Sequence, residues 1–220
     1  MKDHIEDLYD YDVLRATLTP TMFVLHLAAS TLVLGGSQSL GVLDLERLGE
    51  TPLRRRRGGG GLVLLQPDDL WIDWWIPTGD ARWSNDVRAS SIIVGEWWAK
   101  ALTNEVEGVI SVHTGALEGE VANRAVCFAG KGPGEVFVDG RKAVGLTQWR
   151  VREGIFISTV LHASPSYGLL EYLKHVPDGI DQTLDHQTVS ALGIDDPDAL
   201  VVALAGVSGP WQIRHLFLNA

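Results

Sequence analysis

The chain has 220 residues, enough for one domain with a substantial core, and its formal net charge is −10. Hydrophobic residues make up 45% of it and charged residues 21%, which excludes intrinsic disorder as the main state. The negative balance disfavours binding to nucleic acid or to anionic lipid, because both carry the same sign of charge.

The cysteine content and the N-terminal residues indicate a cytoplasmic protein. Cys127 is the only cysteine, so no disulfide can form within the chain, as is usual in a reducing compartment. Residues 1–7 are too acidic for a signal peptide. The apolar stretch over residues 22–34 is too short to span a bilayer, so we expect no membrane binding.

The first part of the chain predicts short strands and helices. Residues 11–18 have mixed character and fit a strand or a short helix. Residues 26–34 end in a β-branched and aliphatic run before two glycines, which predicts a buried strand. Residues 43–48 predict a short surface helix. The apolar runs at 62–65 and 70–76 are separated by a Pro-Asp-Asp turn and predict an antiparallel hairpin.

Residues 85–105 give the clearest helix signal in the chain, because their apolar residues recur at helical spacing. Asp139-Gly140 between two apolar runs is the strongest hairpin signal, since a tight turn needs positive φ. This order of elements favours an α+β fold in a single domain over residues 1–220. The remaining elements are expected as strands at 108–113, 135–138, 141–146 and 154–161, and as helices at 166–175, 187–191 and 196–205.

A run of arginines and glycines is the first unusual feature, with Arg54 to Arg57 directly before Gly58 to Gly61. Glycine lets backbone amides approach a ligand closely, and guanidinium groups suit phosphate or carboxylate. The composition leaves a ligand loop and a solvated turn equally open. No Gly-Lys-Ser/Thr ending follows, which excludes a P-loop. An RNA-contacting segment is disfavoured by the acidic net charge.

Cys127 and Lys142 form a second group of candidate site residues. A glycine-rich stretch and the Asp139-Gly140 turn lie between them in the sequence. A cysteine near lysines can act as a nucleophile, and a positioned cation can stabilise charge on an acyl oxygen. Each residue also has a plainer interpretation, a small core residue for Cys127 and an exposed side chain for Lys142. The seven histidines show no metal-ligand spacing, so we predict no metal site.

Three segments, taken in order, resemble the lipoate-protein ligase and octanoyltransferase family. Residues 55–63 resemble its arginine and triple-glycine loop, and residues 135–148 resemble its Gly-[Arg/Lys]-Lys hairpin. Residues 32–38 resemble the strand and turn before the arginines. The resemblance implies the fold of biotin-protein ligases and class II aminoacyl-tRNA synthetases, a mixed, largely antiparallel sheet flanked by helices. At this length we expect no C-terminal accessory domain of the kind that many such ligases carry.

The same resemblance implies roles for individual residues. Lys142 would contact the acyl carbonyl and, in ligases, the adenylate phosphate, while Cys127 would be the nucleophile of a cysteine-using transferase. The glycine loop and the hairpin would line one apolar pocket for a lipoyl or octanoyl group. The substrate-binding positions are Arg55, Arg56, Gly59, Gly60, Gly61, Gly140, Gly145 and Gln148.

The family implies acyl attachment to a lysine of a lipoyl-carrier protein, by one of two routes. A transferase takes the acyl group from a thioester, for example on acyl carrier protein, and needs no tightly bound cofactor. A ligase activates free lipoate or octanoate with ATP and Mg²⁺. The cysteine and the expected absence of an accessory domain favour transfer, and the ligase and a catalytically silent acyl-binding module are the alternatives. The implied acceptors are the E2 subunit of 2-oxoacid dehydrogenases and the glycine-cleavage H protein.

Overall fold

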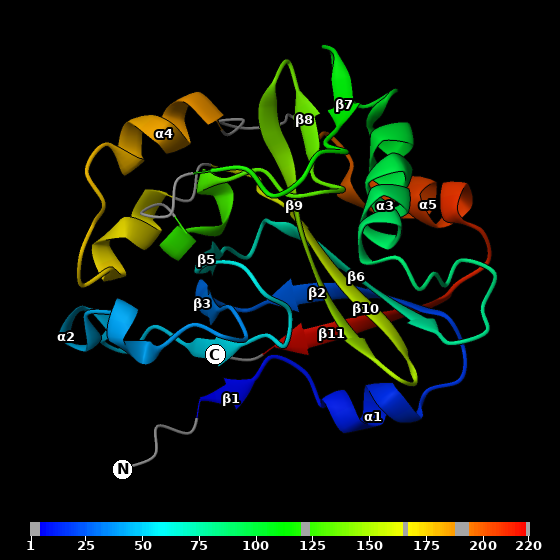
Figure 1. Ribbon diagram of the computed structural model, residues 1–220, viewed down its shortest axis with the longest axis horizontal. Coiled ribbons are helices and arrows are strands. Elements are labelled where there is room, and N and C mark those ends of the chain that lie inside the picture. The colour runs from blue at the N-terminus through cyan, green and yellow to red at the C-terminus, as the bar shows by residue number, and fades with distance from the viewer. Residues whose placement is uncertain (1–4, 120–123, 165–166, 188–193, 219–220) are drawn as a thin grey trace.

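A seven-stranded sheet forms the centre of the computed structural model, which describes residues 5–119, 124–164, 167–187 and 194–218 (Figure 1). Its strand order is β11-β2-β6-β10-β9-β8-β7, and every pair is antiparallel except β11 with β2. The predicted α+β class with a mixed, largely antiparallel sheet is therefore confirmed. The strands are β2 (Thr21–Leu27), β6 (Leu70–Pro77), β7 (Ile110–Val112), β8 (Val136–Val138), β9 (Arg141–Val151), β10 (Gly154–Leu161) and β11 (Gln212–Leu218).

A smaller four-stranded sheet has the order β1-β4-β3-β5. It joins the N-terminal segment to the arginine run, because β1 pairs in parallel with β4, and β4 in turn pairs with β3. The glycines lie between β4 and β5, so this sheet carries both ends of the glycine-rich loop. Its strands are β1 (Glu6–Asp7), β3 (Thr31–Leu34), β4 (Leu53–Arg55) and β5 (Val63–Leu65).

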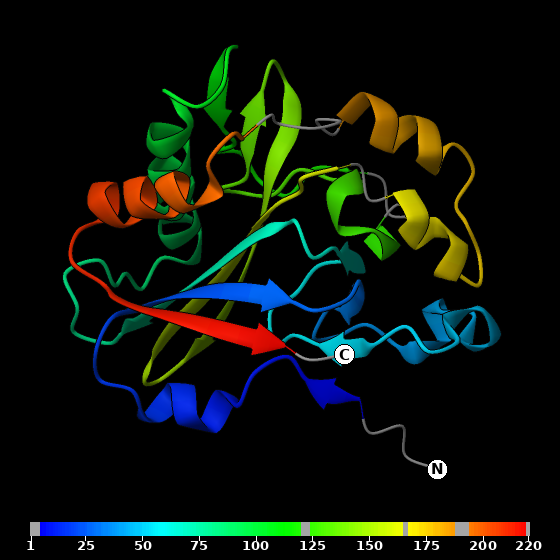
Figure 2. The same ribbon diagram turned by 180° about the vertical axis from the view of Figure 1, so that it is seen from behind.

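Helices complete two hydrophobic cores, one on each face of the large sheet. Helices α3 (Val87–Leu102) and α5 (Pro197–Ser208) lie side by side and cover one face (Figure 2). The small sheet, α1 (Tyr11–Ala16), the short helix η4 (Tyr167–Tyr172) and α4 (Ile180–Gln187) supply the core on the other face. Among the described residues, no helix combines the length and the apolar character needed to cross a membrane. The short elements left are η1 (Leu40–Val42), α2 (Leu45–Leu48) and η3 (Cys127–Ala129).

Two strand predictions were wrong because the chain passes from one sheet to the other between β2 and β3, and again between β5 and β6. The expected single strand at 26–34 is divided between β2, in the large sheet, and β3, in the small one. The expected hairpin of 62–65 with 70–76 does not form, since β5 pairs with β3 while β6 pairs with β2 and β10. Strand β6 is buried on both faces, so its apolar run gives no sign of which strands flank it.

Other predictions were confirmed or need adjustment. The hairpin of β8 with β9 turns through Asp139 and Gly140, whose φ angles are 50° and 78°. The helix expected at 85–105 is α3, which is capped by Asp86. The segment expected as a helix at 166–175 contains the 3₁₀ helix η4 instead. The helix expected at 187–191 lies outside the described residues apart from Gln187, which ends α4.

Candidate functional site

Arg56 is only 1% exposed and contacts the glycine loop, residues 58–61. Its Nη2 donates hydrogen bonds to the carbonyl oxygens of Gly59 and Gly61, at 2.8 and 2.7 Å. Its Nη1 donates to the carbonyl of Val33 in β3, at 3.2 Å. Burial lowers the pKa of the Arg56 guanidinium, and nearby Cys127 partly opposes that shift. Arg56 thus contacts the protein's own carbonyls, and it does not line the cavity described below.

The other arginines of the run also have partners within the chain. Arg55 donates from Nη1 to the carbonyls of Gly35 and Gln38, at 3.1 and 2.8 Å. Arg54 pairs with Glu6 at 3.1 Å, and Arg57 pairs with Asp7 at 2.5 Å. The two acids lie on β1, so the arginine run serves to join the two parallel strands. All four guanidinium groups of the run therefore have partners within the chain.

The glycine loop needs glycine at its closest approaches. A Cβ on Gly35 would collide with the carbonyl oxygen of Gly60, so the turn after β3 and the loop pack backbone to backbone. Gly60 itself has φ of +89°, a conformation that other residues rarely adopt. Thr147 of β9 donates to the carbonyl of Gly59 at 3.0 Å and ties the loop to the large sheet.

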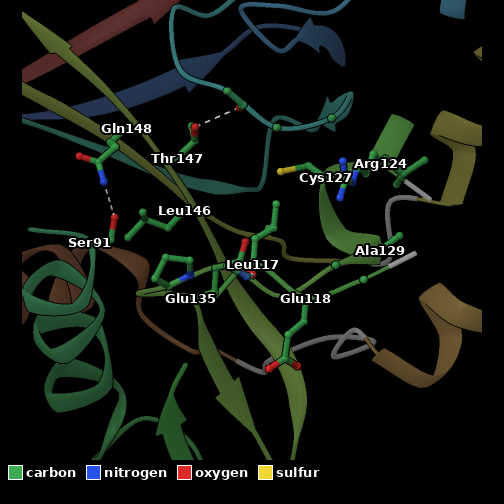
Figure 3. A pocket seen from close by; sticks show the side chains of 18 of the residues that line it. Ser91, Leu117, Glu118, Arg124, Cys127, Ala129, Glu135, Leu146, Thr147 and Gln148 are labelled. Carbon is green, nitrogen blue, oxygen red and sulfur yellow. Dashed lines mark hydrogen bonds between the residues drawn. The ribbon is translucent and has the colours of Figure 1, made fainter. Parts of the chain in front are cut away.

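A cavity of about 420 Å³ opens between the glycine loop, the Cys127 segment and strand β9 (Figure 3). This size lies within the usual range for a small-molecule site, roughly 300–1,000 Å³. The glycine loop and the Lys142-bearing hairpin therefore line one cavity, as the resemblance requires. The lining residues include Ser37, Gln38, Gly59, Gly60, Gly61, Ser91, Glu118, Arg124, Cys127, Glu135, Leu146, Thr147 and Gln148.

Cys127 is fixed beside the loop by backbone pairing. The amide of Leu62 donates to the carbonyl of Ala125 at 2.7 Å, and the amide of Cys127 donates to the carbonyl of Leu62 at 3.1 Å. A Cβ built on Gly60 would lie 3.4 Å from the Cys127 sulfur, so the thiol lies against the middle of the loop. Figure 3 shows the sulfur pointing into the cavity.

Lys142 and Glu135 form a buried ion pair next to Cys127. The Lys142 ammonium lies 2.8 Å from Glu135 Oε2, and the two side chains are 1% and 5% exposed. Lys142 also donates to the carbonyl of Cys127 at 3.2 Å and lies 5.0 Å from the ring centre of Phe128. Glu135 Oε2 accepts a further hydrogen bond from the amide of Gly132 at 2.6 Å. Glu135 lines the cavity, and Lys142 does not.

The structure brings together part of the predicted site. Gly59, Gly60, Gly61, Cys127 and Gln148 line the cavity. Lys142 adjoins it through Glu135 and the Cys127 carbonyl, and Gly145 packs against the ring of Phe128. Arg55 bonds to the carbonyls of the turn after β3, while Gly140 lies at the hairpin turn and lines a different cleft, beside Ser111 and Lys131.

Several lining residues were not among the predicted ones, namely Ser37, Gln38, Ser91, Glu118, Arg124, Glu135, Leu146 and Thr147. Some had a sequence signal, because Glu135, Leu146 and Thr147 fall inside the hairpin motif and Ser37 and Gln38 inside the segment before the arginines. Arg124 had none, since its place depends on the pairing of the next residues with Leu62. In the described portion of the chain, no three His, Cys, Asp or Glu side chains gather in a way that could hold a metal ion.

Neither the known protein-family models nor the curated proteins contain a match to this sequence. Solved structures do match. A lipoate-protein ligase A bound with ATP aligns with a TM-score of 0.68 and 14% identity, over 96% of this chain and 82% of that one. The bi-partite lipoate protein ligase of Thermoplasma acidophilum, described with its E2 lipoyl domain, gives 0.66 and 16%, over 99% and 88%.

A Thermoplasma acidophilum protein solved with bound lipoic acid gives a TM-score of 0.64 and 14% identity, over 96% of this chain and 82% of that one. These alignments cover 96–99% of this chain. The identities are low, so the likeness concerns the arrangement of the backbone. This chain therefore has the fold of the lipoate-protein ligases.

Proposed function

We propose that this chain transfers an octanoyl or lipoyl group from a thioester donor, through Cys127, to a lysine of a lipoyl-carrier domain. The observation that carries the proposal is the position of the Cys127 thiol, against Gly60 and inside the cavity. A thiol that served only in packing would not need to face a cavity of this size. The lipoate-protein ligase fold supports the same class of reaction.

The proposed reaction has two balanced steps. The Cys127 thiolate attacks the acyl carbonyl of the donor, a bond forms between sulfur and the acyl carbon, and the donor leaves as a thiol that takes up the proton lost by Cys127. The amine of the acceptor lysine then attacks the acyl carbon. An amide bond forms, the bond to Cys127 breaks, and the proton of the amine passes to the cysteine sulfur.

The remaining residues hold the reacting atoms in place. The glycine loop has no side chains that would keep an acyl group away from its backbone. Arg56 and Thr147 keep that loop in one conformation through hydrogen bonds to its carbonyls. Lys142 acts as a positioning residue, because its hydrogen bond to the Cys127 carbonyl fixes the backbone that carries the thiol. Gln148 anchors the far wall of the cavity through hydrogen bonds to Ser91 and Val87 of α3, both at 2.6 Å.

The proposed acceptors are lipoyl domains of E2 subunits and the glycine-cleavage H protein, and the proposed donor is an acyl carrier protein. A lipoate protein ligase of the same fold was described together with its E2 lipoyl domain, which supports a carrier of that kind. No nucleic-acid partner is proposed, because the net charge is −10 and all four arginines of the run have partners within the chain.

The decisive experiment is mass spectrometry of the intact protein after incubation with octanoyl-carrier thioester. The wild type should gain one octanoyl group, Cys127→Ser should gain none, and a lipoyl domain added afterwards should remove the group from the enzyme. A wild type that acylates the lipoyl domain without any intermediate on Cys127 would contradict the role of the cysteine.

A second candidate function is ATP-dependent ligation of free lipoate or octanoate, with Mg²⁺ as the metal that accompanies the nucleotide. It is favoured by the similarity to a lipoate-protein ligase A bound with ATP. Acylation of the lipoyl domain that needs ATP and persists in Cys127→Ala would establish it. Ligand binding without acylation under either donor would identify a silent acyl-binding module.

A further inference from the structure

Glu135 pairs with the buried ammonium of Lys142 next to the cavity. The Lys142 ammonium, 1% exposed, already has a carboxylate partner at 2.8 Å and a carbonyl partner at 3.2 Å. Glu135 lines the cavity, and Lys142 does not. An incoming carboxylate would therefore meet the buried negative charge of Glu135. The positive charge of Lys142 is already paired with that glutamate.

We propose that Glu135 is the specificity residue of the cavity, which excludes free fatty-acid carboxylates and admits neutral acyl groups such as thioesters. A neutral acyl carbonyl meets no repulsion from Glu135 and can occupy the space next to the thiol. A free octanoate or lipoate anion would either sit beside the like charge of Glu135 or have to displace it from Lys142. Displacement would also break the hydrogen bond from the Gly132 amide to Glu135, at 2.6 Å.

Burial makes this selection effective. Like charges repel weakly in water but strongly where water is excluded, and Glu135 is 4% exposed. The other acid that lines the cavity, Glu118, has a side chain that is 60% exposed, so solvent screens its charge. The two glutamates thus offer the same chemical group in one cavity, buried in one case and solvated in the other.

The inference rests on the proposed function, because it names the class of acyl donor that the same site accepts. Its test does not require catalysis. Calorimetry of the full chain with octanoate and with octanamide compares two ligands that share one acyl chain and differ in charge. The wild type should bind octanamide at least tenfold more tightly than octanoate. A wild type that binds octanoate as tightly as octanamide, or more so, would overturn the proposal without any variant.

The variant Glu135→Gln keeps the side-chain size and leaves the Lys142 charge without an anionic partner. It should shift the ratio of the two affinities at least tenfold toward octanoate. Glu118→Gln is the matched control and should shift the ratio less than twofold. The pair Glu135→Gln with Lys142→Met restores neutrality and should lose the gain for octanoate. Equal shifts in Glu135→Gln and Glu118→Gln would refute the role of Glu135.

The outcomes separate this inference from the proposed transfer reaction. Preference for octanamide in a protein that never forms a thioester on Cys127 would support Glu135 as a selector and reject the transfer mechanism. Thioester formation in a protein that binds octanoate as well as octanamide would do the opposite.

Discussion

The side-chain ammonium of Lys142 donates a hydrogen bond to the backbone carbonyl of Cys127, at 3.2 Å, while Glu135 balances its charge at 2.8 Å. One lysine thus connects strand β9 to the candidate nucleophile and to the carboxylate in the cavity wall. The arrangement is buried, so its energetics depend on keeping every partner in place.

The first prediction concerns this ion pair. Lys142→Met should lower the free energy of unfolding by about 3–5 kcal/mol, because Glu135 would be left buried without a cation. Combining Lys142→Met with Glu135→Leu should recover a large part of that loss, since both charges are then absent. Urea denaturation of the wild type, both single variants and the double variant measures the coupling. Losses that simply add would show that the two side chains do not interact.

A second prediction separates two neighbouring arginines. Arg56→Met removes a buried guanidinium that bonds to the carbonyls of Val33, Gly59 and Gly61, so it should cost about 3–5 kcal/mol of stability. Arg57→Met is the matched control. Its side chain is half exposed and pairs with Asp7 near the surface, so its loss should cost less than about 1 kcal/mol.

The same two variants also test the link between the loop and the site. If Arg56 holds the glycine loop, Arg56→Met should lose acyl binding under conditions where the variant is still folded, whereas Arg57→Met should bind normally. Thermal denaturation and calorimetry with octanamide provide the two readouts. Full acyl binding in folded Arg56→Met would show that the loop keeps its shape without the guanidinium.

The local signals in the sequence were sufficient for the hairpin and the long helix. Asp139-Gly140 can supply the positive φ values of the turn, and the apolar spacing of α3 matches its buried face. The pairing of strands that lie far apart in the sequence could not be predicted from such local signals. Residues 62–65 and 70–76 read as partners because a turn joins them, yet they belong to different sheets. Their apolar runs indicate burial on both faces, but they do not identify the strand with which each one pairs.

The candidate site shows the same limit. The motifs placed the glycine loop and Lys142 in one region, but the acidic partners of Arg54 and Arg57 arise from the pairing of β1 with β4, 48 residues apart at Glu6 and Arg54. The pair of Lys142 with Glu135 depends on the register of β8 with β9, which shifts between Val136 and Phe137. The internal partners of these charged side chains therefore could not be predicted from the motifs alone.

A third prediction uses the contact of Gly145 with Phe128, which neighbours Cys127. A Cβ on Gly145 would lie 2.8 Å from two atoms of the Phe128 ring, so Gly145→Ala should push that ring and lower stability by about 1–3 kcal/mol. Gly206→Ala is the control, because Gly206 lies inside helix α5 with no atom near the added methyl. It should raise stability by about 0.5–1 kcal/mol.

The rate of octanoyl transfer to Cys127 is the second quantity to compare between Gly145→Ala and Gly206→Ala. Displacement of Phe128 should slow acylation of Cys127 in Gly145→Ala at least tenfold, because the two residues share the short helix η3. Gly206→Ala should react at the wild-type rate. An unchanged rate in a destabilised Gly145→Ala would mean that the position of Phe128 does not govern the thiol.

A fourth prediction concerns pH and Asp73, a carboxyl buried in the core of β6. Burial raises its pKa to about 7, and the hydrogen bond from the Tyr9 hydroxyl opposes the shift. In the unfolded chain the same group has an ordinary pKa of about 3.9, so between these values the folded state holds more protons. The stability that Asp73 contributes is therefore fully present below about pH 4 and is lost as the pH rises through about 7.

Asp73→Asn removes this dependence, because the amide does not titrate. The difference in unfolding free energy between variant and wild type should move in favour of the variant as the pH rises from about 4 to about 7, and then stay level. Thermal denaturation of both proteins across that range measures it, and the other ionisable groups cancel in the difference. A difference that stays constant with pH would show that Asp73 keeps an ordinary pKa in the folded protein, with its charge compensated in the core.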